Sequence, residues 1–156
     1  ELSKSNDVVV GAGTVRNLAQ AKRALDAGAK FLVSPGLNED VLGFSETKDL
    51  LYLPGVLTPT EIMRATELGS EVVKIFPAAS VGGAEYLRAL SGPFPEVKWV
   101  ATGGIKIEDT RDYMRAGAFA IGLGSQLAPK EAIHSKNWKE ITRIAKQCVT
   151  TVGGSR

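Results

Sequence analysis

Val72-Val73-Lys74-Ile75-Phe76-Pro77 is a short run of β-branched and aromatic residues with one lysine at its centre. Such runs are typical of strands in a parallel sheet, because both faces of the sheet are covered and the alternation of polar and apolar residues is lost. Side chains alternate along a strand, so Lys74 shares a face with Val72 and Phe76. The run therefore predicts an α/β fold with a lysine on an apolar face.

Lys74 itself allows two interpretations, because lysine is rarely buried without a partner or a task. In the first, desolvation lowers the pKa of the amine and leaves it neutral enough to attack a carbonyl carbon. In the second, Lys74 reaches water from a strand end or pairs with a carboxylate. On these six residues alone the second is the more common outcome.

The bulk composition excludes several classes of protein. The chain has 156 residues and a formal net charge of +2, which is too small to indicate nucleic-acid binding. No stretch approaches the ~20 apolar residues of a membrane span, and residues 1–7 lack the apolar core of a signal peptide. The single cysteine, Cys148, lies in a segment of helical pattern, so we expect it to be buried and not nucleophilic, in a reducing, cytoplasmic compartment.

Short apolar runs recur along the chain, with stretches of helical period between most of them. The runs lie at residues 8–10, 31–33, 51–53, 72–76, 97–101 and 119–123. The helical stretches carry Leu18, Ala21 and Leu25, then Ile62, Ala65 and Leu68, then Tyr86, Leu87 and Leu90, and a last helix is expected at about residues 138–149. This alternation predicts a βα repeat in a single domain over residues 1–156, with a frayed tail from residue 153.

The ends of the expected helices carry their own signals. Gly28, Gly69 and Gly117 each close a helical stretch just before a strand and are plausible C-caps. Thr58-Pro59-Thr60-Glu61 has the pattern of a capping box, so Glu61 is expected to cap a helix and not to act as an acid or base.

Glycine, proline and hydroxyl residues gather where the expected strands end. These loops are residues 11–14, 34–36, 54–55, 76–77, 102–104 and 122–125. Ligands of parallel α/β folds bind at the carboxyl ends of the strands. Gly103-Gly104 and Gly124-Ser125 follow the last two strands, where bare amides hold phosphate in (β/α) barrels. Tight turns that require positive φ would explain each loop separately, but the placement favours phosphate.

Seven of these motifs, taken in order, resemble the 2-keto-3-deoxy-6-phosphogluconate (KDPG)/4-hydroxy-2-oxoglutarate aldolases. The motifs are Gly11-Ala12-Gly13-Thr14-Val15, Ser34-Pro35-Gly36, Leu53-Pro54-Gly55-Val56, Lys74-Ile75-Phe76-Pro77-Ala78, Gly92-Pro93-Phe94, Thr102-Gly103-Gly104-Ile105 and Gly122-Leu123-Gly124-Ser125. They run from about Val8 to the last helix in unbroken order, and together they are far more specific than any one of them.

The resemblance implies a (β/α)8 TIM barrel and a class I aldolase that needs no metal and no other cofactor. It implies that Lys74 forms a Schiff base with pyruvate or with KDPG, so that the C3–C4 bond breaks and releases glyceraldehyde 3-phosphate. Partners are then small phosphorylated keto sugar acids and pyruvate, with neither nucleic acid nor membrane, in the Entner–Doudoroff breakdown of sugar acids. The resemblance also implies a homotrimer.

The resemblance carries over to further residues. Thr14 matches the family threonine near the pyruvate carboxylate, Pro35 and Phe76 match walls of the pocket, and Thr102 matches a position that lines the substrate chain. The residues that fall where the family binds phosphate are Gly103, Gly104, Gly124 and Ser125. Relatives often have Gly-Gly-Ser where this chain has Gly122-Leu123-Gly124-Ser125, which keeps the amide and hydroxyl donors.

The departure from the family lies at the front of the chain, where six βα units stand against the eight of the barrel. Aligned on the motifs, residues 8–10 are the third strand. We expect the first two units, with the glutamate that shuttles protons and the arginine that binds the pyruvate carboxylate, to be encoded upstream by a strand with Glu-x-x-x-Arg. General acid–base help is worth ~10² to 10⁴ in rate, so this stretch alone should be a slow catalyst.

Two other functions stay open at this stage. The first is a catalytically impaired phosphosugar-binding remnant of the same family. The second is another phosphate-binding barrel, such as an epimerase or a thiamine phosphate synthase, although neither chemistry needs an amine on the middle strand. Four other residues are expected to be structural: Glu71 and His134 solvated at the surface, Trp99 in the core, and Trp138 as the anchor of the last helix.

Overall fold

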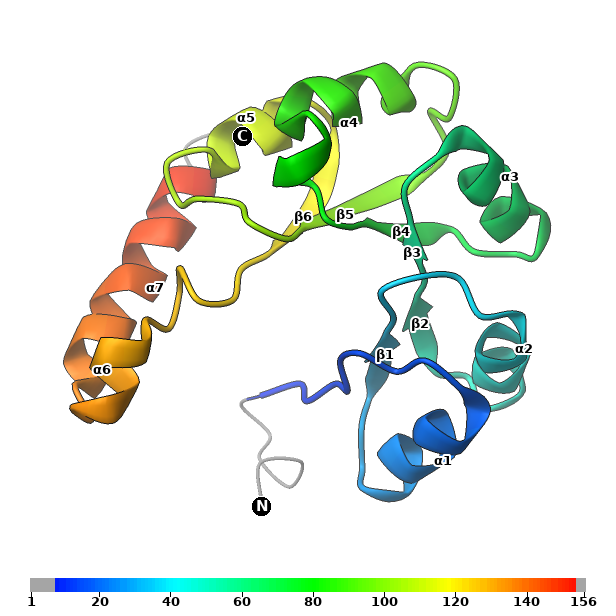
Figure 1. The fold of residues 1–156 in the computed structure, drawn as a ribbon, viewed down its shortest axis with the longest axis horizontal. Coiled ribbons are helices and arrows are strands. Elements are labelled where there is room, and N and C mark those ends of the chain that lie inside the picture. Colours follow the sequence, from blue (N-terminus) through cyan, green and yellow to red (C-terminus); the bar gives the residue numbers. More distant parts are fainter. Residues whose placement is uncertain (1–7, 154–156) are drawn as a thin grey trace. The chain divides into compact units, whose positions relative to one another are not determined.

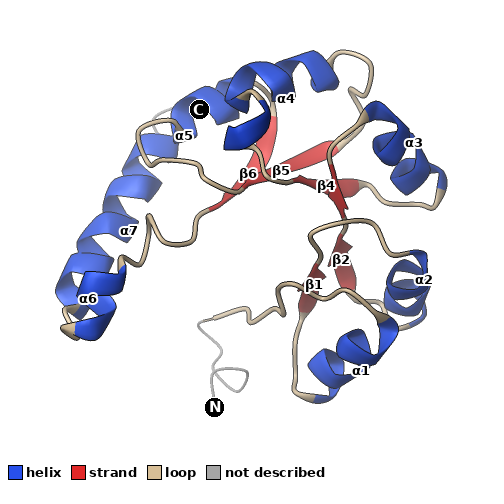
Figure 2. Cartoon of the chain, viewed as in Figure 1, coloured by secondary structure: helices blue, strands red, loops and turns tan. Residues whose placement is uncertain are grey.

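The protein is represented by a computed structural model that describes residues 8–153. These residues form two compact units. Unit 1 comprises residues 8–76 with 96–98, and unit 2 comprises residues 77–95 with 99–153. Strands and helices alternate along both units (Figure 2), as the sequence predicts.

Unit 1 is built of parallel strand pairs with helices between the strands (Figure 1). Its elements are α1 (Leu18–Asp26), β1 (Phe31–Val33), α2 (Glu39–Thr47), β2 (Leu51–Leu53), β3 (Gly55–Val56), α3 (Pro59–Glu67) and β4 (Val72–Ile75). In the β1–β2 pair Leu32 lies opposite Tyr52, and in the β3–β4 pair Gly55 lies opposite Lys74. The core beneath the first pair holds the apolar faces of α1 and α2, which lie side by side in Figure 1.

The predicted strand at residues 51–53 is confirmed as β2. Residues 54–55 were expected to be a loop, but after Pro54 the chain forms a further short strand, Gly55–Val56, with a different partner. Proline has no N–H to donate to a ladder, so pairing changes partner at this residue. The carbonyl of Pro54 still accepts a hydrogen bond from the N–H of Lys74 at 2.8 Å, which places the lysine opposite the start of β3.

The prediction of a strand at residues 8–10 is wrong. Only a single bridge forms in this region, between Ala12 and Leu32 of β1. Val8 and Val9 are 51% and 73% exposed, so they have no covered face to order them as a ladder. The carbonyl of Val10 nevertheless accepts from the N–H of Lys30 at 2.8 Å, so the segment runs beside β1 in extended form.

Unit 2 holds the second half of the repeat. Its elements are a 3-10 turn (Ala79–Val81), α4 (Gly83–Ser91), β5 (Lys98–Thr102), α5 (Thr110–Arg115), β6 (Ala118–Gly122), α6 (Lys130–His134) and α7 (Trp138–Gly153), with Lys98 at the start of β5 counted in unit 1. Strands β5 and β6 are parallel, and Thr102 lies opposite Gly122. Trp99 is 2% exposed, as expected of a core residue.

Trp138 does not anchor the last helix. It is 58% exposed at the first residue of α7, and the buried face of that helix begins at Ile144 and Cys148. The apolar stripe of an amphipathic helix, rather than its largest side chain, decides which face is covered. Helix α7 also runs to Gly153, so the tail predicted from residue 153 is helical at its first residue, and residues 154–156 lie outside the described part of the chain.

The three glycine C-caps are confirmed. Gly28, Gly69 and Gly117 have φ values of 90°, 90° and 105°, in the left-handed region that other residues adopt only at a cost. Each lets the chain leave its helix and enter the next strand within a few residues.

The capping box at α3 provides a test of local stability. The Thr58 hydroxyl accepts from the N–H of Glu61, and the Glu61 carboxylate accepts from the N–H of Thr58 at 2.7 Å. We expect Thr58→Ala to lower the free energy of unfolding by about 1 kcal/mol in urea denaturation. Thr60→Ala, two residues on and exposed, is the matched control and should be nearly neutral. Equal losses in the two variants would contradict the cap.

Candidate active site

Lys74 lies in β4 with its side chain buried. The residue is 9% exposed, and Val73 and Ile75, which point to the opposite face of the strand, are 0% and 1% exposed. Its Nζ donates to the carbonyl oxygen of Ser34 at 3.1 Å and lies 4.4 Å from the centroid of the Phe76 ring. In the described residues no carboxylate forms an ion pair with it. The amine is therefore held by a neutral acceptor and an aromatic face.

Burial lowers the pKa of the Lys74 amine, because desolvation penalises its charged form. The Ser34 carbonyl and the Phe76 ring both favour the ammonium and so oppose the shift in part. A lowered pKa increases the fraction of neutral amine near pH 7, and the neutral form is the nucleophile. Of the two interpretations of Lys74, the buried one describes the structure.

The lowered pKa also makes a prediction about stability. The unfolded chain holds a proton on this lysine up to its ordinary pKa, whereas the folded chain releases it earlier, so wild-type stability should rise with pH between the two values. We expect Lys74→Met to raise the free energy of unfolding at pH 7, and its advantage to shrink as the pH approaches 10.5, the ordinary lysine value. Urea denaturation at pH 7 and 9.5 measures this, with Lys22→Met on the exposed face of α1 as the control. An advantage that grows with pH would contradict the assignment.

The other candidates of unit 1 lie in loops. Phe76 comes directly after β4 and is 37% exposed, with its ring against the Lys74 amine. Thr14 is exposed and adopts φ of 59°, a left-handed conformation that is strained for a β-branched residue. Pro35 is exposed directly after Ser34, whose carbonyl holds the amine.

The loop at residues 34–36 approaches β3 more closely than any side chain there would allow. A Cβ atom on Gly55 would lie 2.2 Å from the carbonyl oxygen of Pro35 and 2.6 Å from the N of Gly36. Since both are backbone atoms, the loop could not yield without moving the chain. Gly55 therefore sets the position of the Pro35–Gly36 peptide, which directly follows the peptide that carries the Ser34 carbonyl.

Ser34 is a site residue that the sequence did not single out. It is 1% exposed, its hydroxyl donates to the carbonyl of Val15, and its own carbonyl accepts from Lys74. Within Ser34-Pro35-Gly36 it has the composition of an ordinary turn, and its bonding partner Val15 lies 19 residues away. A serine directly before a Pro-Gly pair at the end of a predicted strand is the signal that could have marked it.

The candidates for phosphate lie in unit 2, after two adjacent parallel strands. Gly103 and Gly104 follow β5 with φ of 99° and 75°, and Gly124 and Ser125 follow β6. Since Thr102 pairs with Gly122, both loops leave the same edge of the β5–β6 pair. Among described residues, the N–H groups of Gly104, Gly124 and Ser125 donate to no protein acceptor, so they are available to an anion.

Four residues expected to be structural or bystanders behave as predicted. Glu71 is a surface residue paired with Lys98 at 3.0 Å, His134 is exposed at the end of α6, Glu61 caps α3, and Cys148 is buried in α7.

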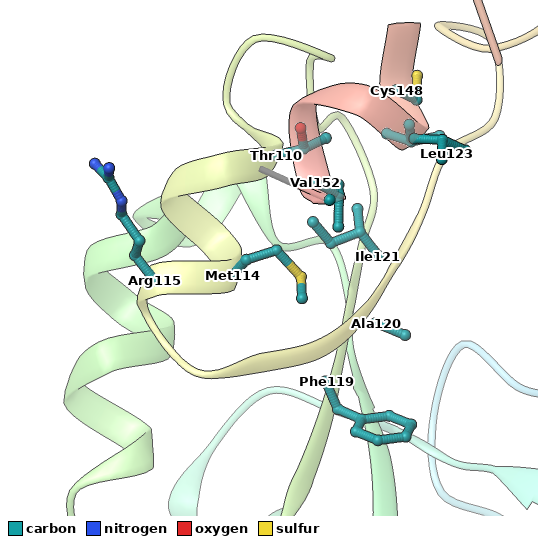
Figure 3. A pocket seen from close by; sticks show the side chains of 11 residues that line it. Thr110, Met114, Arg115, Phe119, Ala120, Ile121, Leu123, Cys148 and Val152 are labelled. Carbon is teal, nitrogen blue, oxygen red and sulfur yellow. The ribbon is translucent and has the colours of Figure 1, made fainter. Parts of the chain in front are cut away.

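A cavity of about 680 Å³ in unit 2 is unrelated to this chemistry. Figure 3 shows Met114, Ile121 and Val152 pointing toward one another within it. Phe119 and Val149 on its lining are 65% and 73% exposed. Its lining is mainly apolar, although Thr110, Arg115 and Cys148 belong to it, and it includes none of the candidate site residues.

Two features of residues 8–153 bear on the class of site. No group of three or more His, Cys, Asp or Glu side chains there is arranged to hold a metal ion. Within the same residues, no helix combines the length and the apolarity that a bilayer span requires.

A protein-family model matches most of the chain. The family model for KDPG and KHG aldolases matches residues 2–144. This range includes every candidate site residue in both units.

Individual relatives agree with that family. The 2-dehydro-3-deoxy-phosphogluconate aldolase of Pseudoalteromonas atlantica is 36% identical over 148 residues, which are 95% of this chain and 69% of the relative. The aldolase of the same name from Dickeya dadantii is 37% identical over 92% of this chain and 67% of its own length. The solved KDPG aldolase of Legionella pneumophila, with pyruvate captured as a covalent carbinolamine, is 36% identical with a TM-score of 0.84, over 93% of this chain and 69% of that one.

Proposed function

This chain belongs to the KDPG and KHG aldolase family, and on that premise we propose that it is a class I aldolase acting through Lys74. The reaction is the reversible cleavage of KDPG to pyruvate and glyceraldehyde 3-phosphate. Cleavage of 4-hydroxy-2-oxoglutarate to pyruvate and glyoxylate is a second reaction of the same kind. The observation that carries the proposal is the buried amine of Lys74 with its lowered pKa, bound to a neutral carbonyl instead of a carboxylate.

The chemistry begins with the neutral amine. The Nζ lone pair of Lys74 bonds to the C2 keto carbon, the C=O π electrons pass to the oxygen, and that oxygen takes up a proton to give a carbinolamine. Loss of water leaves a protonated imine. The C3–C4 bond then breaks with its electron pair moving toward the imine, while the C4 hydroxyl gives up its proton and glyceraldehyde 3-phosphate leaves. Protonation of the resulting enamine at C3 and addition of water to the imine release pyruvate and the free amine.

Residues of unit 1 are assigned to the pyruvate half of the substrate. Thr14 is proposed to donate its hydroxyl to the pyruvate carboxylate, and Pro35 and Phe76 to form apolar walls. The exposure of Thr14 and Pro35 supports this, because both are accessible to a ligand from solvent. Phe76 lies against the amine and so borders the reacting carbon.

Residues of unit 2 are assigned to the phosphorylated half. Gly104, Gly124 and Ser125 offer unpaired N–H groups after β5 and β6, and Gly103 gives the first loop its left-handed turn. Thr102, at the end of β5, is assigned to the substrate chain. Phosphate binding by bare amides at strand ends is common in barrels of this type.

Membership of the family supports four further features of the proposal. We infer a single domain over residues 1–156, because the family model runs from 2 to 144 without a break. We also infer a homotrimer in the cytoplasm, which sedimentation analysis and fractionation of cells would check. The partners are small molecules: pyruvate and a phosphorylated keto sugar acid.

Borohydride trapping tests the function. The full-length protein is incubated with labelled pyruvate and sodium borohydride, which reduces an imine to a stable amine, and the labelled peptide is sequenced by mass spectrometry. We expect one pyruvate-derived label, on Lys74. A protein that takes no label, or takes it on another lysine, would overturn the proposal.

A further inference from the structure

Ser34 forms hydrogen bonds through both its side chain and its backbone. Its hydroxyl donates to the carbonyl of Val15, and its carbonyl accepts from the amine of Lys74 at 3.1 Å. The residue is 1% exposed, so both bonds form away from water, where an unmade bond is costly. Ser34 thus links the turn at Thr14–Val15 to the amine of Lys74.

The turn at Thr14–Val15, which the Ser34 side chain contacts, is strained. Thr14 adopts φ of 59°, and a β-branched residue holds that conformation only where its surroundings impose it. The N–H of Val15 donates to the carbonyl of Val33 at 3.0 Å, and its carbonyl accepts the Ser34 hydroxyl. Both backbone groups of Val15 are therefore tied to consecutive residues at the end of β1, which fixes Thr14 in its unusual conformation.

The peptide of Ser34 is itself held from further sides. The Tyr52 hydroxyl, buried beside Ser34, donates to the carbonyl of Gly36 at 3.4 Å and accepts from the N–H of Asn38 at 3.3 Å. Burial raises the pKa of Tyr52, while its bonds with the Ser34 side chain and with Asn38 oppose the rise. The phenol therefore stays protonated, and its hydrogen bonds to Gly36 and Asn38 hold the loop after Ser34 in place.

From this arrangement we propose that Ser34 is a positioning residue that aligns the substrate carboxylate contact at Thr14 with the amine of Lys74. The proposal rests on the proposed aldolase function. The Ser34 carbonyl takes one N–H of the neutral amine and thereby limits the directions in which the lone pair can point. After attack, the same carbonyl faces the N–H of the protonated imine, where a charge-assisted hydrogen bond is stronger. The hydroxyl sets where this carbonyl sits relative to Thr14.

Ser34→Ala removes the hydroxyl and keeps the backbone carbonyl. We expect its KM for the keto acid to rise about tenfold, with a smaller loss in kcat, because one buried hydrogen bond that orients Thr14 is lost. Ser45→Ala is the matched control: Ser45 is 2% exposed and its hydroxyl bonds to the Val41 carbonyl at 2.8 Å, but within α2. Its stability should fall comparably and its KM should not change.

A double-mutant cycle separates positioning from general loosening. If Ser34 acts through Thr14, Ser34→Ala in a Thr14→Ala background should raise KM less than twofold further, since the contact it orients is already gone. Should Ser34→Ala fail to fold, Ser34→Cys keeps the size with a weaker donor and is used in the same cycle. Independent, multiplying effects, or a folded Ser34 variant with wild-type KM, would overturn the proposal. Absence of pyruvate trapping in the wild type would instead overturn the aldolase function on which it rests.

Discussion

Replacing Lys74 by arginine is expected to lower kcat for KDPG cleavage by at least ~10³-fold, about 4 kcal/mol of transition-state stabilisation. Arginine keeps the positive charge and most of the length, but its guanidinium is always protonated and cannot form an imine. The loss would therefore report the nucleophile and not the charge. Steady-state kinetics coupled to pyruvate release measures it, and the variant should take no label in borohydride trapping.

Lys98→Arg is the control for that experiment. Lys98 is also a strand lysine, but it pairs with Glu71 at the surface, with 48% of its side chain exposed. Its conversion to arginine should leave kcat within twofold, because a surface ion pair tolerates the exchange. A Lys74→Arg enzyme that kept a tenth or more of wild-type kcat would show that Lys74 is not the covalent centre.

The family and the α/β barrel class with about six βα units are predicted from sequence and confirmed by the family model and the solved relatives. The reason is that each signal is local. A glycine C-cap such as Gly28 or Gly69 can be recognised from its place at the end of a helical stretch, and the capping box at Thr58 needs only four consecutive residues. Patterns of this kind can be recognised in the sequence without any knowledge of tertiary contacts.

What the sequence could not supply depends on distant partners. Residues 8–10 have strand composition, but nothing covers Val8 or Val9 in the described structure, so no ladder forms. Ser34 looks like a turn residue until its bonds to Val15 and Lys74, 19 and 40 residues away, are seen. The role of Lys74 could not be decided from its own strand, because the burial of a side chain depends on the residues that pack against it.

Gly55 is the position at which the smallest change should have the largest effect on stability. A Cβ there would meet the Pro35 carbonyl oxygen at 2.2 Å, and neither backbone can give way by rotating a side chain. Overpacking of a rigid site costs typically 1–3 kcal/mol and more where backbone must move. We therefore expect Gly55→Ala to lower the free energy of unfolding by about 3 kcal/mol, a large share of the ~5–15 kcal/mol that a domain has.

Gly43→Ala in α2 tests whether the loss at Gly55 comes from contact and not from the exchange of glycine itself. No atom lies within 4 Å of a Cβ at Gly43, so alanine should stabilise the helix by roughly 0.5–1 kcal/mol. Urea denaturation of both variants gives opposite signs if the close approach exists. Because the displaced Pro35–Gly36 peptide adjoins the Ser34 carbonyl that accepts from the Lys74 amine, the folded fraction of Gly55→Ala should also trap pyruvate more slowly. Wild-type stability and trapping in that variant would mean that the 34–36 loop does not pack on β3 and cannot position the amine.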